Sequence, residues 1–245
     1  MALRRLLPDP AETVDLIEAY RYPSDTTWLR ANMIASADGA ATIDGRAGCL
    51  GNSTDQQLLG LLRGLADVVI AGAGTVTAEG YGPGRVRAEY QDIRAAAGQL
   101  PAPTMVVVSK RLQLDFESKY FVQAAQQPIV VTCATAPEDR LLAARKVAEV
   151  VIAGDIAVSP ALMVAALGGL GHRRLLCEGG PTLLGTVAAD GVLDELCLTI
   201  APMLVGGPSR RVLEAPPLDP APKLALTQLL QDDDDLLYAR YEVLR

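Results

Sequence analysis

Short apolar stretches alternate with segments of helical periodicity along most of the 245-residue chain. The apolar stretches are rich in valine, isoleucine and leucine, the composition of strands that are buried on both faces of a sheet. We predict strands over residues 27–36, 66–72, 104–110, 128–134, 148–154, 173–180, 194–207 and 236–244. Between them, the spacing of apolar residues predicts helices over 10–19, 52–65, 137–146, 159–170 and 181–191. This order predicts an α/β fold, with a mostly parallel central sheet and helices on both faces.

The end of the chain has a different pattern. Within 236–244, Tyr238, Arg240 and Glu242 alternate with apolar residues, which is typical of a half-exposed edge strand or antiparallel strand. We therefore expect antiparallel strands at the C-terminus. The acidic run 232–235 before them could bind a metal, but such a run directly before a strand is more typical of a solvated turn.

The sequence contains no obvious linker between domains. We predict a single domain over residues 1–245, with residues 1–26 as a helical extension packed on it. The longest irregular segment, 81–103, is expected to flank a ligand, because long loops inside compact domains usually have a function. The proline-rich segment 208–222 is predicted to be a second loop.

Composition and charge exclude several classes of protein. The formal net charge is −7 and no basic stripe is present, whereas nucleic acids and anionic membranes both select clustered lysine and arginine. No apolar run reaches the roughly 20 residues of a membrane-spanning helix. The N-terminus also lacks the apolar core of a secretory signal. We expect a soluble cytoplasmic protein that binds a small molecule.

Cysteine and histidine are scarce. Cys49, Cys133, Cys177 and Cys197 lie far apart in the sequence, which argues against a metal site and favours buried thiols in a reducing compartment. The single histidine, His172, falls in a helix-to-strand connection, the place of an ordinary solvated turn residue. A two-histidine metal site is excluded, and so are the ligands of a zinc deaminase. Hydride transfer from a cofactor remains, because it needs few titrating side chains.

Ligands of open α/β sheets bind beyond the carboxyl ends of the strands. Four predicted strands end in glycine or small polar residues, at 36–39, 71–75, 108–111 and 178–182. Gly72 and Gly74 allow a close backbone approach, and Thr75 begins a short helical segment whose amides could hold phosphate. Gly179–Gly180 precede the helix from Pro181 in the same way and resemble a cradle for a dinucleotide pyrophosphate.

The usual G-x-G-x-x-G fingerprint is missing, which disfavours an ordinary Rossmann dehydrogenase. Lys110 and Arg111 follow a predicted strand end, where a 2′-phosphate would require positive charge. They favour NADP over NAD, although two solvated loop cations explain the same pattern.

Four motifs occur together: S-x-D-G at 36–39, a helix with L-L-R at 61–63, a strand ending G-x-x-T at 72–75, and E-G-G-P-T at 178–182. With these, the chain from about Trp28 to its end resembles the pyrimidine reductase family of riboflavin biosynthesis. That family has the dihydrofolate-reductase-like fold and forms the reductase half of a bifunctional deaminase/reductase. The resemblance implies NADPH-dependent reduction of the ribosyl group of 5-amino-6-(5-phosphoribosylamino)uracil to ribityl. No deaminase part is recognised, so we expect the reductase step alone.

The resemblance also implies roles for individual residues. Cofactor contacts are implied at Ala35, Thr75, Glu79, Ser109, Gly180, Pro181, Thr182, Leu183 and Leu184. Glu178 matches a substrate-contacting acid and is a candidate catalytic residue, while Arg63 matches a basic residue placed for the substrate phosphate. Asp38 could support the loop beside the nicotinamide or serve only its own turn. Leu50 replaces a tryptophan of the bifunctional enzymes, and Glu79 replaces an aspartate.

Two other functions remain open. Dihydrofolate reductases place one carboxylate on the helix after the first strand to assist pterin reduction, and Asp55 is a candidate for that catalytic position, or a helix-capping residue. A nucleotide-binding protein without catalytic activity could retain the same fold.

We also expect a homodimer, by analogy with the family and because the late apolar strands could form an interface.

Overall fold

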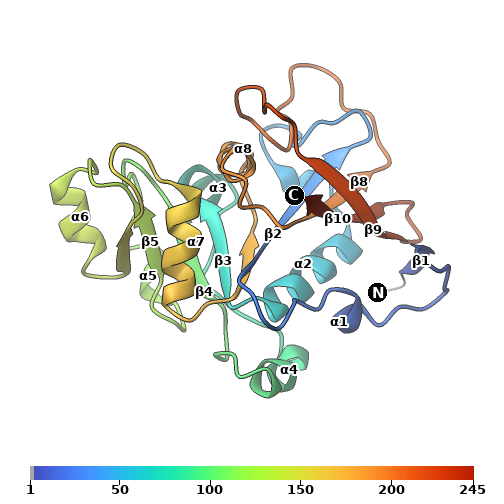
Figure 1. Cartoon of the computed structure of the whole chain (residues 1–245), viewed down its shortest axis with the longest axis horizontal. Coiled ribbons are helices and arrows are strands. Elements are labelled where there is room, and N and C mark those ends of the chain that lie inside the picture. Colours follow the sequence, from blue (N-terminus) through green and yellow to red (C-terminus); the bar gives the residue numbers. More distant parts are fainter. Residues whose placement is uncertain (1–2) are drawn as a thin grey trace.

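The computed structural model describes residues 3–245. Its strands form one ten-stranded sheet in the order β1-β9-β10-β8-β2-β7-β3-β4-β5-β6 (Figure 1). They are β1 (Arg4–Leu7), β2 (Trp28–Ser36), β3 (Val68–Gly72), β4 (Thr104–Val108), β5 (Ile129–Thr132), β6 (Glu149–Ile152), β7 (Arg174–Cys177), β8 (Glu195–Ala201), β9 (Lys223–Gln231) and β10 (Leu237–Leu244). Neighbours are parallel from β8 to β6 and antiparallel among β8, β10, β9 and β1. The predicted mostly parallel sheet with antiparallel C-terminal strands is confirmed.

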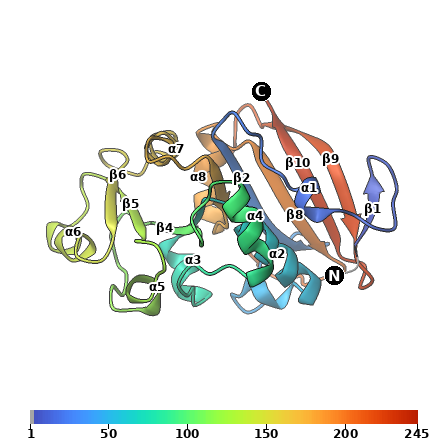
Figure 2. The same ribbon diagram turned by 90° about the horizontal axis from the view of Figure 1, so that it is seen from below.

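Helices cover both faces of the sheet, as predicted. They are α1 (Leu16–Ala19), α2 (Ser53–Leu65), α3 (Ala73–Ala78), α4 (Gln91–Ala96), α5 (Lys119–Val122), α6 (Glu138–Ala144), α7 (Pro160–Gly169) and α8 (Pro181–Ala189). Figure 2 shows α7 and α8 on one face and α2, α3 and α5 on the other. Strand β3 contributes side chains to the hydrophobic core on each face of the sheet. Val69 and Ala71 pack in the core that includes α2. Val68 and Ile70 pack in the core that includes α7 and α8. No helix among residues 3–245 is long and apolar enough to span a membrane.

Helix α2 forms for the reasons visible in its sequence. The Asn52 side chain caps it by accepting hydrogen bonds from the amides of Thr54 and Asp55. The apolar stripe of Leu58, Leu61, Leu62 and Leu65 is buried against the sheet. The segment then continues directly into β3. The packing of α2 therefore fixes where its cavity-facing residues lie relative to the strand ends.

The N-terminal segment differs from the predicted helical extension. The helix expected over 10–19 is only the short α1, because Ala11 forms a bridge with Arg5 and keeps the preceding chain extended. The segment also contributes strand β1, which pairs with β9. Likewise, the strand expected over 194–207 ends at Ala201, where Pro202 follows and cannot donate to the ladder.

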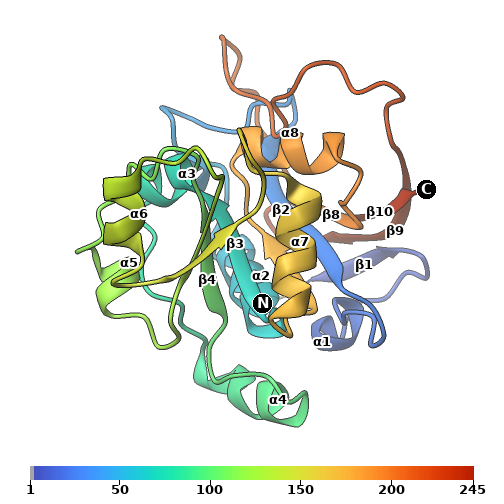
Figure 3. The ribbon, with the colours of Figure 1, turned by 60° about the vertical axis from the view of Figure 1, so that its left-hand side comes forward.

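Besides β1, strand β9 and helices α4 and α5 were not predicted. Strand β9 lies after the proline-rich loop, and α4 lies inside the irregular segment 81–103 and projects away from the sheet (Figure 3). Because β9 covers one side of β10, β10 is an inner antiparallel strand, and the described edges of the sheet are β1 and β6. The acidic run 232–235 is the turn between β9 and β10, as expected, but its first residue, Asp232, is buried.

Candidate active site

The sheet opens beyond the end of β7. Strand β2 pairs with β7 as far as Ala31 and Cys177, and then continues beside β8 alone to Ser36. The chain after Cys177 stays with β3, because the Glu178 amide donates to Ile70 O at 2.9 Å. The separation leaves a cavity of about 540 Å³ between β2, α2, α3 and the start of α8. This is the carboxyl edge of the parallel strands, where the sequence predicts the ligand site.

A glycine turn forms one wall of this cavity. The Gly72 amide donates to Gly179 O at 2.7 Å, and Gly179 has a φ of +80°, which favours glycine. A Cβ on Gly180 would lie 2.5 Å from the Thr75 hydroxyl oxygen, so a larger residue would displace its neighbours. Helix α8 begins immediately after this turn, with Gly180 as an N-cap that has no side chain to bond the first amides.

Glu178 is held in the cavity by a cation and a phenol. Arg63 donates from Nε to Glu178 Oε1 and from Nη2 to Oε2, both at 2.7 Å, and Tyr81 donates its hydroxyl to Oε2 at 2.5 Å. The Arg63 guanidinium also lies 5.2 Å from the centroid of the Tyr81 ring. Burial alone would lower the pKa of Arg63, but Glu178 and Tyr81 together raise it. Burial and the Glu178 carboxylate raise the pKa of Tyr81, so the phenol remains a hydrogen-bond donor.

The Arg63–Glu178 pair changes the expectation for Arg63. Residues 115 positions apart in the sequence meet in a bidentate ion pair, in which only the Glu178 side chain is fully buried. The Arg63 side chain remains 32% exposed. Its guanidinium is therefore already paired with a carboxylate, so Arg63 does not offer the unpaired cation that was expected to bind the substrate phosphate.

Asp55 enters the same cavity from the first turn of α2. Its Oδ1 accepts a hydrogen bond from the Thr199 hydroxyl of β8 at 2.9 Å. Burial raises the pKa of Asp55, the hydrogen bond from Thr199 lowers it, and the nearby Asp232 raises it, with a net increase. Asp55 and Glu178 thus line one cavity in opposite electrostatic settings.

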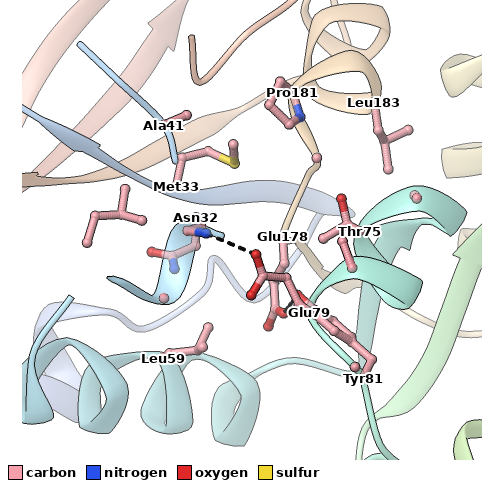
Figure 4. Close-up of a pocket in the computed structure, with 18 of the residues that line it drawn as sticks. Asn32, Met33, Ala41, Leu59, Thr75, Glu79, Tyr81, Glu178, Pro181 and Leu183 are labelled. Carbon is pink, nitrogen blue, oxygen red and sulfur yellow. Dashed lines mark hydrogen bonds between the residues drawn. The ribbon is translucent and has the colours of Figure 1, made fainter. Parts of the chain in front are cut away.

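The remaining residues predicted to contact cofactor fall into two groups. One group lines the cavity: Gly72, Gly74, Thr75, Glu79, Gly180, Pro181, Thr182 and Leu183. Figure 4 labels Thr75, Glu79, Pro181 and Leu183 among them. The other does not line it: Ala35, Asp38, Ser109, Lys110, Arg111, Gly179 and Leu184. Within the second group, Leu184 is buried in the core, and the Ser109 hydroxyl accepts a hydrogen bond from the Leu112 amide. Lys110 and Arg111 line a separate depression beyond the ends of β4 and β5.

Asp38 and Glu79 both fasten loops. Asp38 accepts a hydrogen bond from Ser36 Oγ and from the amides of Val205 and Gly206, and these bonds lower its pKa to about 2. It therefore joins the turn after β2 to the loop after β8. Glu79 Oε1 accepts from the Ala47 amide at 3.0 Å. Asp38 thus bonds beyond its own turn, while its place beside the nicotinamide stays a prediction.

Sequence reasoning missed several cavity residues. Asn32 lies in β2 and lines the cavity, and no hydrogen bond of its side chain is found among residues 3–245. Tyr81 and Arg85 lie in the segment 81–103, which was expected to flank a ligand but from which no residue was singled out, and Arg210 comes from the segment 208–222. The exposed Arg85 forms no ion pair with any described residue, whereas Arg210 pairs with Glu214. A tyrosine two residues after Glu79 was the available signal, but it belongs to no motif.

Comparison with known proteins agrees with this architecture. Residues 27–238 match the family described as the RibD C-terminal domain. A protein of Methanothermobacter thermautotrophicus named 2,5-diamino-6-ribosylamino-4(3H)-pyrimidinone 5′-phosphate reductase is 33% identical over 181 residues, which are 74% of this chain and 76% of that protein. A protein of the same name from Archaeoglobus fulgidus is 29% identical over 177 residues, 72% of this chain and 80% of that protein.

Solved structures give the same result. A pyrimidine reductase-like protein of Corynebacterium diphtheriae has a TM-score of 0.81 and 29% identity, with 89% of this chain and 92% of that chain covered. The yeast riboflavin biosynthesis reductase Rib7, at 14% identity, shares the fold with a TM-score of 0.64 over 94% of this chain and 98% of that chain. The match to the family spans far more than half of the sequence and includes every wall of the cavity described above. The chain belongs to the RibD C-terminal domain family.

Proposed function

We propose that this protein is an oxidoreductase that reduces the ribosyl group of a 5′-phosphorylated ribosylaminopyrimidine to ribityl, with NADPH as hydride donor. The observation that carries this proposal is the cavity at the opening of the sheet, in which a glycine turn and the start of α8 lie beside the Glu178–Arg63–Tyr81 group. The names of the two archaeal relatives support the reductase activity that the sequence predicts.

The glycine turn fits a dinucleotide. Gly180 leaves the space beside Thr75 free of any Cβ, and the first amides of α8, at Thr182 and Leu183, have no partner within the helix. Helix amides and the helix dipole attract phosphate at such a terminus. A dihydronicotinamide bound along this wall would supply a hydride to C1′ of the sugar. The protein's own residues would bind the cofactor, orient the sugar and exclude water.

Binding of NADPH can be tested without turnover. We expect Gly180→Ala to weaken NADPH binding at least tenfold, measured by quenching of protein fluorescence, because the new methyl group would lie against Thr75. Gly169→Ala is the matched control, since a Cβ at this α7 position meets nothing within 4 Å. Equal affinities of both variants and the wild type would contradict this cofactor position.

The preference for NADPH over NADH rests on Lys110 and Arg111. Both side chains are exposed on the same carboxyl edge of the sheet as the cavity, beyond β4 and β5, and form no ion pair within residues 3–245. A guanidinium and an ammonium suit a 2′-phosphate. Replacing both with alanine should reduce the ratio of NADPH to NADH affinity without changing NADH affinity. An unchanged ratio would remove the assignment.

The substrate phosphate needs a free cation. Because Arg63 is engaged by Glu178, we assign the phosphate to Arg85, which is exposed at the cavity and unpaired among the described residues. The predicted substrate is a uracil, with oxygen at pyrimidine C2, whereas the relatives are named for a 2-amino pyrimidinone. The two compounds share the phosphoribosylamino group on which the reduction would occur.

One assay tests the activity itself. NADPH oxidation is followed with 5-amino-6-(5-phosphoribosylamino)uracil, with its 2-amino counterpart and with dihydrofolate. We expect turnover of at least one of the two pyrimidines and none of dihydrofolate. Turnover of dihydrofolate alone would favour the pterin reductase, and NADPH binding without any turnover would favour the nucleotide-binding protein without catalytic activity; each result would overturn the proposal.

Dimerisation and location complete the proposal. The outer face of β8, β9 and β10 carries Leu198, Ile200, Leu224, Leu226 and Tyr241, none of which is fully buried in the single chain. An apolar sheet face of this kind suits a second copy of the chain, related by a two-fold axis. A monomer at micromolar concentration in sedimentation would contradict it. The protein would act in the reducing cytosol, which its free thiols support. It would do so as a single domain.

A further inference from the structure

Three carboxyl groups of the described chain line the cavity, and their partners differ. Glu178 receives three hydrogen bonds from Arg63 and Tyr81. Glu79 is exposed and bonded to the Ala47 amide. Asp55 receives one hydrogen bond, from Thr199, and faces no cation at hydrogen-bond distance. Glu178 already accepts three hydrogen bonds and Glu79 is exposed, so of the three groups Asp55 is the half-buried one that keeps an oxygen without a donor from the described chain and is placed to give a proton to a substrate.

The second oxygen of Asp55 is kept accessible by a glycine. No donor among residues 3–245 reaches Oδ2, and a Cβ built on Gly51 would lie 2.5 Å from it. Any larger residue at position 51 would therefore fill the space beside this oxygen. A carboxyl group with one oxygen fixed by Thr199 and the other free has the geometry of a proton donor in a site.

The acidic turn between β9 and β10 supplies a like charge behind Asp55. Asp232, 4% exposed, accepts from Tyr238 Oη and Asn52 Nδ2, both at 2.8 Å, and from the amides of Asp234 and Leu236. Every partner is a donor, which is the arrangement of a carboxylate. Asn52 also caps α2 through Oδ1, so one side chain connects the acidic turn to the helix end that carries Asp55.

We propose that Asp55 is a further catalytic residue of the reduction, the acid that protonates the sugar ring oxygen, and that Asp232 is a positioning residue that keeps Asp55 in its acid form. The inference rests on the proposed function. It gives the acidic run, which the fold alone uses only as a turn, a role in the site.

The chemistry balances with one proton and one hydride. As the glycosylamine opens, the nitrogen lone pair forms the C1′=N bond, the C1′–O4′ bond breaks, and O4′ takes the proton of Asp55. C1′ then gains a hydride from the dihydronicotinamide, which is oxidised, and the iminium nitrogen becomes a neutral amine. Asp55 recovers its proton from water. The overall reaction consumes one proton, as the conversion of ribosyl to ribityl requires.

The electrostatic surroundings set the expected pH dependence. The titratable or charged groups that face Asp55 are Asp232 from the turn, Tyr238 from β10, and, around the cavity, Glu178, Glu79, Arg63, Tyr81, Arg85 and Arg210. Burial and Asp232 raise the pKa of Asp55, and Thr199 opposes them. Activity should thus fall as pH rises through the pKa of Asp55.

Three variants of the full chain test the inference. Asp55→Asn should lower kcat by about 10²–10⁴-fold, the range for general acid catalysis, while NADPH affinity changes less than threefold. Asp232→Asn should move the alkaline limb of the kcat/KM profile to lower pH. Thr199→Val should move it to higher pH. Asp233→Asn is the matched control for Asp232→Asn, because it makes the same charge change at an exposed position of the same turn.

A second readout does not depend on turnover. The carboxyl carbon of Asp55, assigned by its loss in Asp55→Asn, is titrated by ¹³C NMR in the wild type and in both neighbouring variants; its pKa should fall in Asp232→Asn and rise in Thr199→Val. Equal kcat for Asp55→Asn and wild type, or an Asp55 pKa that both neighbours leave unchanged, would overturn the inference alone. A wild type inactive with both pyrimidines would overturn the proposed function as well.

Discussion

Glu178 and Asp55 reach the same cavity from opposite walls, and the walls treat the two carboxyl groups differently. On the β7 side, Arg63 and Tyr81 surround Glu178 with donors. On the α2 side, Asp55 has one hydroxyl donor and a carboxylate behind it. Two carboxyl groups in one site can take different roles when their surroundings differ in this way.

The difference follows from where each residue lies in the sheet. Glu178 extends β7 next to β3, and its partners come from the last turn of α2, which carries Arg63, and from the loop that carries Tyr81. Asp55 lies in the first turn of the same helix, where β8 and the turn between β9 and β10 supply its neighbours. The cavity lies where the two halves separate. Changing the wall around either acid should therefore affect it in a direction that the other does not share.

The largest effect is expected from breaking the Glu178 wall. Glu178→Gln leaves the guanidinium of Arg63 without its counter-charge, and removal of one partner from a buried ion pair costs about 3–5 kcal/mol. Because the Arg63 side chain is 32% exposed, we expect a loss of about 2–3 kcal/mol in the free energy of unfolding, measured by urea titration. Turnover should be lost at the same time.

A double variant separates the pair from its parts. Replacing Arg63 and Glu178 together with methionine removes both charges, so stability should recover by at least half of the loss seen in Glu178→Gln, while the enzyme stays inactive. A Glu178→Gln protein within about 0.5 kcal/mol of the wild type, the range of ordinary surface substitutions, would show that the pair carries no such energy.

A smaller effect is expected from the phenol on the same wall. Tyr81→Phe removes one hydrogen bond to a charged acceptor but leaves the bidentate pair, and such bonds contribute about 1.5–3 kcal/mol. We expect a loss near the lower value, about 1.5 kcal/mol, in urea unfolding. Tyr241→Phe is the control, since the Tyr241 hydroxyl makes no hydrogen bond within residues 3–245. Equal stability losses in the two variants would contradict the role of Tyr81.

The sequence predicted the framework of this site better than its connections. Periodicity and glycine turns located the strand ends and α2, because they depend on neighbours in the chain. The Arg63–Glu178 pair could not be derived in this way, since both residues match separate motifs and meet only when β7 lies between β2 and β3. The resemblance named both residues as substrate contacts and gave no sign that each is the other's partner.

The acidic run shows a second kind of limit. Its turn was predicted from local composition, but the burial of Asp232 depends on β9, which the apolar pattern did not reveal after the proline-rich loop. Without β9, nothing places Tyr238 and Asn52 around Asp232. The electrostatic setting of Asp55 therefore depends on three segments that are distant in sequence, and no spacing between them encodes it.

The smallest effect concerns the Asp55 wall and has the opposite sign. Because the pKa of Asp55 is raised in the folded protein, the folded state holds its proton more tightly than the unfolded chain. Its stabilising contribution is complete below the ordinary value of 3.8 and is lost as pH rises through the raised folded value. Asp55→Asn does not titrate, so its stability relative to the wild type should increase across this window, by about 1.4 kcal/mol for each pH unit between the two pKa values.

Urea unfolding of Asp55→Asn and wild type at closely spaced pH values measures that difference, and Asp233→Asn supplies an exposed aspartate for comparison. If the stability of Asp55→Asn relative to the wild type instead decreased as pH rises, the folded protein would favour the carboxylate form of Asp55. The two walls of the cavity would then hold their acids in the same way, and the comparison between them would fail.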